Sequence, residues 1–151
     1  MMPALFYHVT QAPVEEVLET LLTRALAQGW RVECRGTDPE RMDWLDQKLW
    51  LGGDESFLPH GLEGGPHDDL QPVLLSTRPH GAGRQAVMTL DGAEVSAEEV
   101  GTHERVWILF DGRDERAVQR ARDQWRALTA AGAAAQYWND ESGRWEKKAE
   151  R

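Results

Sequence analysis

Cysteine is almost absent from this sequence, since Cys34 is the single thiol among 151 residues. One cysteine cannot form an intrachain disulfide, which suits a reducing compartment. Long hydrophobic runs are also missing, because no stretch approaches the ~18 apolar residues of a membrane-spanning helix. The opening residues, MMPALFYHVTQAPVEE, lack the basic and apolar regions of a signal peptide. We therefore expect a soluble, cytoplasmic protein with no membrane partner.

Basic residues are few in this chain. There are 17 Lys and Arg residues against 26 Asp and Glu residues, which gives a formal net charge of −9. Proteins bind nucleic-acid backbones mainly through Lys and Arg, so this charge argues against DNA binding by the whole molecule. The net charge does not exclude a local basic patch. Such a patch, together with the seven tryptophans, leaves direct binding of single-stranded DNA as a less favoured hypothesis.

The motifs of nucleotide-binding enzymes and hydrolases are missing as well. No G-x-G-x-x-G follows the first predicted strand, and Pro13 stands in the turn where phosphate-binding amides are needed. Neither G-x-x-x-x-G-K-[ST] nor G-x-S-x-G occurs, and Cys34 is interpreted as a small core residue. An unrecognised nucleotide-binding enzyme stays the alternative, with its ligand near Val9 to Pro13 and Phe110 to Arg113.

Histidine and aspartate side chains are the remaining candidates for a metal centre. His60, His67, Asp68 and Asp69 lie close together in the sequence, but they match no helical i, i+4 pair and no zinc-binding spacing. We interpret this segment as a solvated loop. The sequence therefore predicts no catalytic residue, no metal site and no cofactor.

Hydrophobic periodicity is present along most of the chain and predicts strands in alternation with helices. The predicted strands are residues 4–9, 30–35, 72–77, 85–92, 104–110 and 133–139. The predicted helices lie within residues 13–29, 37–50 and 113–132. Residues 93–103 are ambiguous between a loop and a short helix.

This order of elements is typical of a three-layer α/β/α domain with a mostly parallel central sheet. The fold is expected to be Rossmann-like but without a phosphate-binding loop. An antiparallel pairing of residues 72–77 with 85–92 would make the sheet mixed. We expect one domain over residues 1–140, followed by a charged C-terminal tail at 141–151.

The last predicted helix carries a concentration of arginine. Residues 113–126 contain five arginines and three acidic residues, on a chain that is acidic overall. Arg122, Trp125 and Arg126 are spaced i, i+3 and i+4, so they share one edge of the helix. This group suits a ligand with an apolar group beside a carboxylate, because arginine binds carboxylates through two parallel hydrogen bonds. The alternative is that Trp125 is a core residue and the arginines are merely solvated.

The stretch LWLGGDESFLPHG, residues 49–61, reads as a loop but holds two large aromatic side chains. Loops normally carry polar residues, because they run through water. Trp50 and Phe57 are therefore either packed under the domain or exposed to a partner. The composition of the segment leaves both alternatives open.

Several segments together resemble one known family. They are FYHV, AQGWRV, LDQKLW followed by SFLPHG, PVLL, ERVWILF, ARDQWRALTAAG, YW and GRWEKKA, and they span nearly the whole chain. The sequence resembles the chi subunit of bacterial DNA polymerase III, an accessory protein of the clamp-loader complex. The pair LDQKLW and SFLPHG, with its spacing, is the most specific part. The resemblance implies a non-catalytic role in DNA replication, on a nucleotide-binding-like fold without a phosphate loop.

The same resemblance implies two partners. Members of the family bind the acidic C-terminal tail of single-stranded-DNA-binding protein, which ends in a Phe carboxylate, and Arg122, Trp125 and Arg126 match that site. Members also bind the psi subunit of the clamp loader, and Trp50 and Phe57 match that surface. DNA would be reached only indirectly, through these partners.

Two positions depart from the family's pattern at the tail-binding helix. Trp125 stands where better-known members carry tyrosine, so the aromatic character is kept. Val118 stands where they carry a basic residue, one helical turn earlier. The resemblance therefore implies a weaker electrostatic attraction for the acidic tail.

Overall fold

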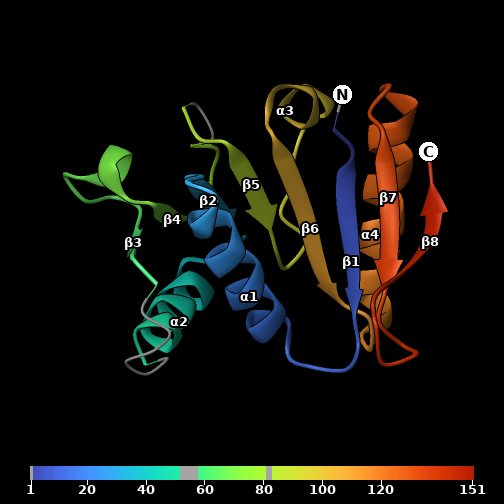
Figure 1. Cartoon of the computed structure of the whole chain (residues 1–151), viewed down its shortest axis with the longest axis horizontal. Coiled ribbons are helices and arrows are strands. Elements are labelled where there is room, and N and C mark those ends of the chain that lie inside the picture. Colours follow the sequence, from blue (N-terminus) through green and yellow to red (C-terminus); the bar gives the residue numbers. More distant parts are fainter. Residues whose placement is uncertain (1, 52–57, 81–82) are drawn as a thin grey trace.

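A single twisted β-sheet forms the centre of the protein (Figure 1). The computed structural model describes residues 2–51, 58–80 and 83–151. Across the eight-stranded sheet the order is β3-β4-β2-β5-β6-β1-β7-β8, and all neighbouring strands are parallel except β7 and β8. The strands are β1 (Ala4–Val9), β2 (Val32–Arg35), β3 (His60–Leu62), β4 (Val73–Ser76), β5 (Ala86–Thr89), β6 (Arg105–Asp111), β7 (Ala135–Asn139) and β8 (Glu146–Glu150).

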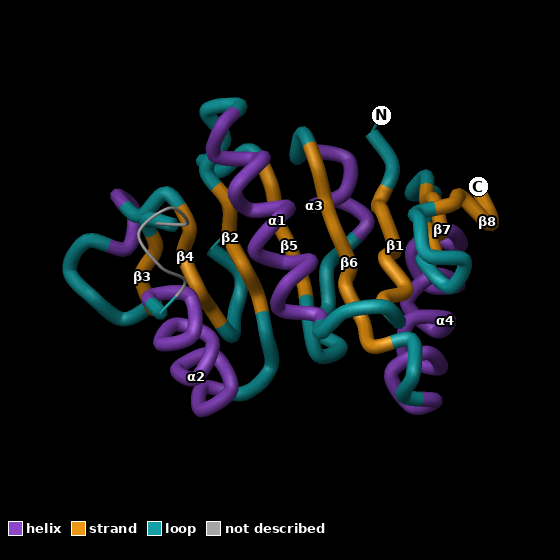
Figure 2. The backbone as a smooth tube through the Cα atoms, turned by 60° about the horizontal axis from the view of Figure 1, so that its bottom comes forward, coloured by secondary structure: helices purple, strands orange, loops and turns teal. Residues whose placement is uncertain are grey.

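Helices cover both faces of this sheet. They are α1 (Val14–Ala27), α2 (Pro39–Trp50), α3 (Ala97–Thr102) and α4 (Glu115–Ala130), with a 3-10 turn, η2, at Asp68–Leu70. As Figures 1 and 2 show, α1 and α2 lie on one face, whereas α3 and α4 lie on the other. The predicted three-layer α/β fold with a mostly parallel sheet is confirmed.

The alternation of side chains along the strands divides the core into two layers. On β1, Leu5 joins the layer under α1 and α2, whereas Ala4 and Phe6 join the layer under α3 and α4. Strands β2, β4 and β5 are buried at every residue, as expected for parallel strands covered on both faces. Because of this alternation, even-numbered residues of β1 point towards α4.

Capping residues define where the helices begin and end. Asp38 caps α2 and Asp114 caps α4, each by accepting a hydrogen bond from a backbone N–H of the first turn. Ser96 and Glu99 form a capping box at α3, which resolves the ambiguous segment 93–103 as a short helix. After α4, Gly132 adopts a φ of 93°, a conformation that favours glycine. Within the described ranges, none of the helices has the length and apolar character needed to cross a membrane.

The sheet differs from the sequence-based expectation in one strand pairing and in two additional strands. The antiparallel pairing of residues 72–77 with 85–92 is wrong, because β4 and β5 lie on opposite sides of β2 and both run parallel to it. The turn-rich link between them therefore does not close a hairpin. Strand β3 was not predicted because it has only three residues. Strand β8 was not predicted either, because its charged sequence is typical of an exposed edge strand and lacks hydrophobic alternation.

A buried ionic cluster lies on the α3 side of β2. Glu33 is fully buried and accepts a hydrogen bond from Arg35 Nε at 2.6 Å. It also accepts one from Ser76 Oγ at 2.9 Å and one from the backbone N–H of His80 at 2.8 Å. Arg35 donates to Glu99 Oε2 at 2.6 Å. Burial alone would lower the pKa of Arg35, but its hydrogen bonds to the two glutamates raise it. We refer to these residues as the Glu33–Arg35–Glu99 cluster.

Candidate functional site

Helix α4 places the three predicted tail-binding residues along one of its edges. The buried face of the helix consists of Ala117, Ala121 and Leu128. This apolar face fixes how the helix is rotated against the sheet. As a result, Arg122 and Arg126 are exposed and Trp125 is half-buried. We call Arg122, Trp125 and Arg126 the α4 edge site.

Trp125 belongs partly to the core and partly to the surface. Its ring packs edge to face on Phe6 of β1, with 5.3 Å between ring centroids, and on Tyr137 of β7, at 6.2 Å. The rest of the indole lines a pocket of about 260 Å³ together with Arg122, Arg126 and Tyr137. The two readings of Trp125, a core residue and a ligand-facing residue, are therefore compatible.

The two arginines of the α4 edge site have few competing partners. Within the described part of the chain, Arg122 forms no hydrogen bond and no ion pair. Arg126 Nη1 lies 3.3 Å from Asp123 Oδ1, and the two side chains are 71% and 63% exposed. Such an exposed pair contributes little stability, so it is easily exchanged for another carboxylate. Both guanidinium groups are thus available to an anionic ligand.

Sequence reasoning missed Tyr137 as a wall of this pocket. In the β1–β7 pair, Tyr137 lies directly beside Phe6, and the ring of Phe6 contacts the ring of Trp125. Tyr137 is also two residues beyond the buried Ala135, so strand alternation places both on the α4 face. The alternation along β7 could be seen in the sequence, but the pairing of β7 with β1 could not.

The second predicted surface lies at the other end of the sheet. Trp50 ends α2 and is 51% exposed, with its ring centroid 4.2 Å from that of the buried His60. Leu51, which follows α2, and Trp44, near the middle of that helix, are exposed as well, so the surface of α2 that leads to its C-terminal end is unusually apolar. Phe57, the other predicted residue, lies outside the described residues. Figure 1 shows α2 at the β3–β4 end and α4 at the β7–β8 end.

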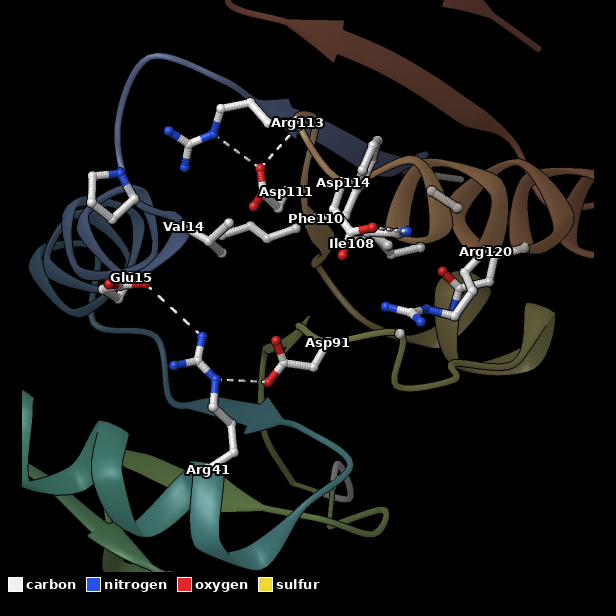
Figure 3. A pocket seen from close by; sticks show the side chains of 16 residues that line it. Val14, Glu15, Arg41, Asp91, Ile108, Phe110, Asp111, Arg113, Asp114 and Arg120 are labelled. Atoms are coloured by element: carbon white, nitrogen blue, oxygen red, sulfur yellow. Dashed lines mark hydrogen bonds and ion pairs between the residues drawn. The ribbon is translucent and has the colours of Figure 1, made fainter.

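A further pocket, of about 290 Å³, lies where the alternative hypothesis placed a nucleotide. Figure 3 shows it between the beginnings of α1 and α4, beside the end of β6. Arg41 contacts Asp91 at 3.0 Å, and Arg113 Nε contacts Asp111 Oδ1 at 3.2 Å. Two of the three arginines that line this pocket, Arg41 and Arg113, are therefore already engaged by carboxylates of the protein, and the third is Arg120.

The beginning of α4 is also closed to a phosphate group. The Asp114 carboxylate accepts hydrogen bonds from the backbone N–H groups of Arg116 at 3.0 Å and Ala117 at 3.5 Å. In nucleotide-binding folds, amides at such a helix terminus bind the phosphate. The other carboxylates that line the pocket are Glu15, Asp91 and Asp111. This arrangement disfavours a phosphate ligand.

Asp68 and Cys34, which were considered for metal binding and nucleophilic chemistry, contribute to the fold itself. In the ranges that the structure describes, no group of three or more His, Cys, Asp and Glu residues could hold a metal ion. The Asp68 carboxylate accepts hydrogen bonds from the backbone N–H groups of Gly64 and Gly65, at 2.9 and 3.0 Å. Cys34 is fully buried, and burial raises the pKa of its thiol. Its interpretation as a core residue is confirmed.

These features define a Rossmann-like α/β protein whose strand-end pocket, at the end of β6, is lined by carboxylates and by internal ion pairs. Its open pocket, on a helix edge, combines guanidinium groups with aromatic rings. The chain belongs to the family of the DNA polymerase III chi subunit, HolC, whose sequence model matches residues 1–136. Comparison with curated proteins gave no match. Membership of this family gives the protein an accessory role in DNA replication, and the resemblance seen in the sequence is confirmed.

Proposed function

We propose that this protein is a non-catalytic accessory subunit that links the clamp loader of bacterial DNA polymerase III to single-stranded-DNA-binding protein. The α4 edge site binds the acidic C-terminal tail of that protein. The observation that carries this proposal is the pocket itself, where two exposed guanidinium groups flank a half-buried indole. A terminal aromatic residue with a free carboxylate matches both halves of this arrangement.

The tail docks as an extended peptide across the edge of α4. Its terminal ring packs beside Trp125, and its carboxylates pair with Arg122 and Arg126 through charge-assisted hydrogen bonds. The local positive charge speeds encounter, so affinity falls as salt concentration rises. A roughly micromolar affinity, about −8 kcal/mol, suits exchange at a replication fork. The net charge of −9 limits competition for the DNA itself.

The surface at the end of α2 binds the second partner in this proposal. Trp50 lies there with Trp44 and Leu51, so an apolar partner surface would cover side chains that water now reaches. The psi subunit of the clamp loader is the proposed occupant. Because the two surfaces lie at opposite ends of the sheet, both partners can be bound at once. Both partners act in the cytoplasm, which is the proposed location of the protein.

Calorimetric titration with a synthetic acidic peptide that ends in a Phe carboxylate tests the tail site. We expect Arg126→Ala to weaken binding by roughly tenfold or more, because a charge-assisted hydrogen bond contributes about 1.5–3 kcal/mol. Trp125→Ala should weaken it at least as much, through loss of the aromatic contact. Arg116→Ala is the matched control, because it removes an exposed arginine of α4 that does not line the pocket. Wild-type affinity in both Arg126→Ala and Trp125→Ala would show that the site is wrong.

The psi surface is tested separately with purified psi subunit. Trp50→Ala should weaken complex formation, whereas Arg126→Ala should leave it unchanged. Trp44→Ala measures how far the contact extends along α2, because it removes a second exposed indole from the same helix. Equal binding by wild type and Trp50→Ala would remove Trp50 from the proposed surface.

The nucleotide-binding alternative is tested by thermal denaturation. If one nucleotide reproducibly raises the melting temperature and the tail peptide does not bind, the enzyme hypothesis is favoured. The carboxylates that line the strand-end pocket predict the opposite result, binding of the peptide and no response to nucleotides.

A further inference from the structure

A buried histidine lies directly behind the α4 edge site. His8, near the end of β1, is 8% exposed, and its ring packs edge to face on Phe110 at 5.3 Å and on Tyr137 at 5.8 Å. A Cβ atom added at Gly112 would lie 2.1 Å from Cδ2 of this ring. The imidazole is therefore packed tightly between β6 and β7 and has little freedom to turn.

The Tyr137 side chain connects this histidine to the pocket. Its hydroxyl lies 2.6 Å from His8 Nδ1, while its ring forms part of the pocket wall beside Trp125. The ring thus has one fixed end, at the histidine, and one face that a ligand can reach. A ligand ring seated against Trp125 would contact Tyr137 as well.

The surroundings of Tyr137 favour one direction for this hydrogen bond. Burial raises the pKa of Tyr137, the charge of Arg122 opposes that effect, and the charge of Glu141 adds to it. The phenol therefore keeps its proton at neutral pH and can donate it to His8 Nδ1.

His8 Nε2 offers no competing anchor. This atom is buried and has no hydrogen-bond partner among the described residues. Glu141 Oε1 lies 3.4 Å from this atom, and the contact is an ion pair only when His8 is protonated. The bond to Tyr137 is therefore the hydrogen bond that ties this histidine to the pocket.

From this geometry we infer that Tyr137 is a binding residue for the terminal aromatic ring of the tail, and that His8 is its positioning residue. The inference rests on the proposed function of the α4 edge site and extends it by two residues. Without the hydrogen bond, the Tyr137 ring is free to leave the pocket wall, and part of the aromatic contact is lost. Tyr137 lies beyond the segment that the family model matches, so its assignment comes from the geometry alone.

The test uses calorimetric titration of the full chain with two acidic peptides, one ending in Phe and one ending in Ala. Tyr137→Phe removes the donor, and His8→Leu removes the acceptor at similar volume. Each should weaken binding of the Phe-ending peptide by roughly 3- to 10-fold, the effect of one hydrogen bond. The affinity for the Ala-ending peptide should hardly change, because that peptide has no ring to place against Tyr137.

Two further variants separate positioning from general stability. The double variant His8→Leu/Tyr137→Phe should bind no more weakly than the weaker single variant, because both changes break the same bond. His8→Asn, whose Oδ1 can accept in place of Nδ1, should recover most of the affinity. Urea unfolding shows which variants are folded, and Tyr137→Phe carries the test if His8→Leu does not fold.

Tyr7→Phe is the matched control, since Tyr7 is the chain's other tyrosine and lies on the α1 side of β1, against Trp145. If wild type binds the peptide and Arg126→Ala weakens it, but Tyr137→Phe and His8→Leu bind as wild type, the inference is overturned and the tail site stands. Additive losses in the double variant would also overturn the role of His8. If wild type binds neither peptide, the proposed function fails, and the inference with it.

Discussion

Arg35 on β2 and the two arginines of the α4 edge site differ in burial and in their partners. Arg35 is buried, and its guanidinium is held by Glu33 and Glu99 within 2.6 Å. Arg122 and Arg126 are exposed, beside a pocket that the protein leaves open. The same side chain therefore serves the fold in one place and is available to a partner in the other.

This difference shows how a structural charge can be told from a recognition charge. A buried charge must be paired, because burying it alone is costly, so its partners come from the same chain. An exposed guanidinium needs no internal partner, and a carboxylate from another molecule can bind it through two hydrogen bonds. The Arg41–Asp91 pair at the pocket at the end of β6 lies between these two kinds, because its side chains are 31% and 33% exposed. The α4 edge site belongs to the second kind.

The largest expected effect is on the buried cluster. Glu33→Ala should lower the free energy of unfolding by about 3–5 kcal/mol, because it leaves the Arg35 charge incompletely paired in the interior. Urea unfolding measures this loss, and Glu33→Gln, which keeps the shape of the side chain, is the control. The folded fraction should still bind the tail peptide normally. A loss below about 1 kcal/mol would contradict the claim that Glu33 stabilises the fold by pairing the buried charge of Arg35.

Reversing the charges of the α4 edge site should give the opposite pattern. The double variant Arg122→Glu/Arg126→Glu should bind the acidic peptide at least ~50-fold more weakly, from the loss of charge-assisted hydrogen bonds and added repulsion. Its free energy of unfolding should change by no more than about 0.5 kcal/mol, because both side chains are exposed. Arg113→Glu/Arg116→Glu, with the same change in net charge, is the control. Equal weakening in both double variants would indicate an unspecific effect of net charge.

Lowering the pH should reduce the contribution of the Glu33–Arg35–Glu99 cluster to the free energy of unfolding. Burial alone would raise the pKa of Glu99, but hydrogen bonds from Arg35 and Ser96 lower it. Ionised Glu99 therefore stabilises the fold above its unfolded pKa of about 4.3, and this contribution is lost as pH falls through the folded pKa. The difference in unfolding free energy between wild type and Glu99→Gln should shrink from about pH 6 to about pH 3. A constant difference across that range would contradict the assignment.

The smallest effect concerns Val118, one turn before Arg122 on the same edge. Val118→Lys should tighten peptide binding by roughly 2- to 5-fold at low salt, as expected for one added surface charge. The gain should disappear at high salt, because exposed charges are screened. Titrations at two salt concentrations measure both results. A gain that persists at high salt would have to come from packing and not from charge.

The parts of the fold that follow local rules could be predicted from the sequence. The buried run of β6 and the helical spacing of α4 predicted the element types, and the predicted ranges 37–50 and 113–132 begin two residues before α2 and α4. The order of strands could not be obtained in the same way. Whether β4 and β5 pair with each other or flank β2 depends on contacts between distant segments, which local periodicity does not contain.

The candidate site shows the same division. Arg122, Trp125 and Arg126 share one helix, so their spacing alone predicted that they would lie together. Tyr137 and His8 reach the site from two other strands, and their contact requires the register of β1 against β7. The Glu33–Arg35–Glu99 cluster was missed for the same reason, because its carboxylates come from separate elements.

The most direct test of the central claim is an NMR titration of the isotope-labelled protein with the Phe-ending acidic peptide, followed through its backbone amide signals. We expect shifts to concentrate on residues 118–129 of α4 and around Tyr137, with no shifts at the end of α2. The same titration of the Arg116→Ala variant should give the same map. Shifts confined to α2, shifts at the strand-end pocket around Asp111, or no shifts at all would contradict the proposal that the α4 edge site binds the tail.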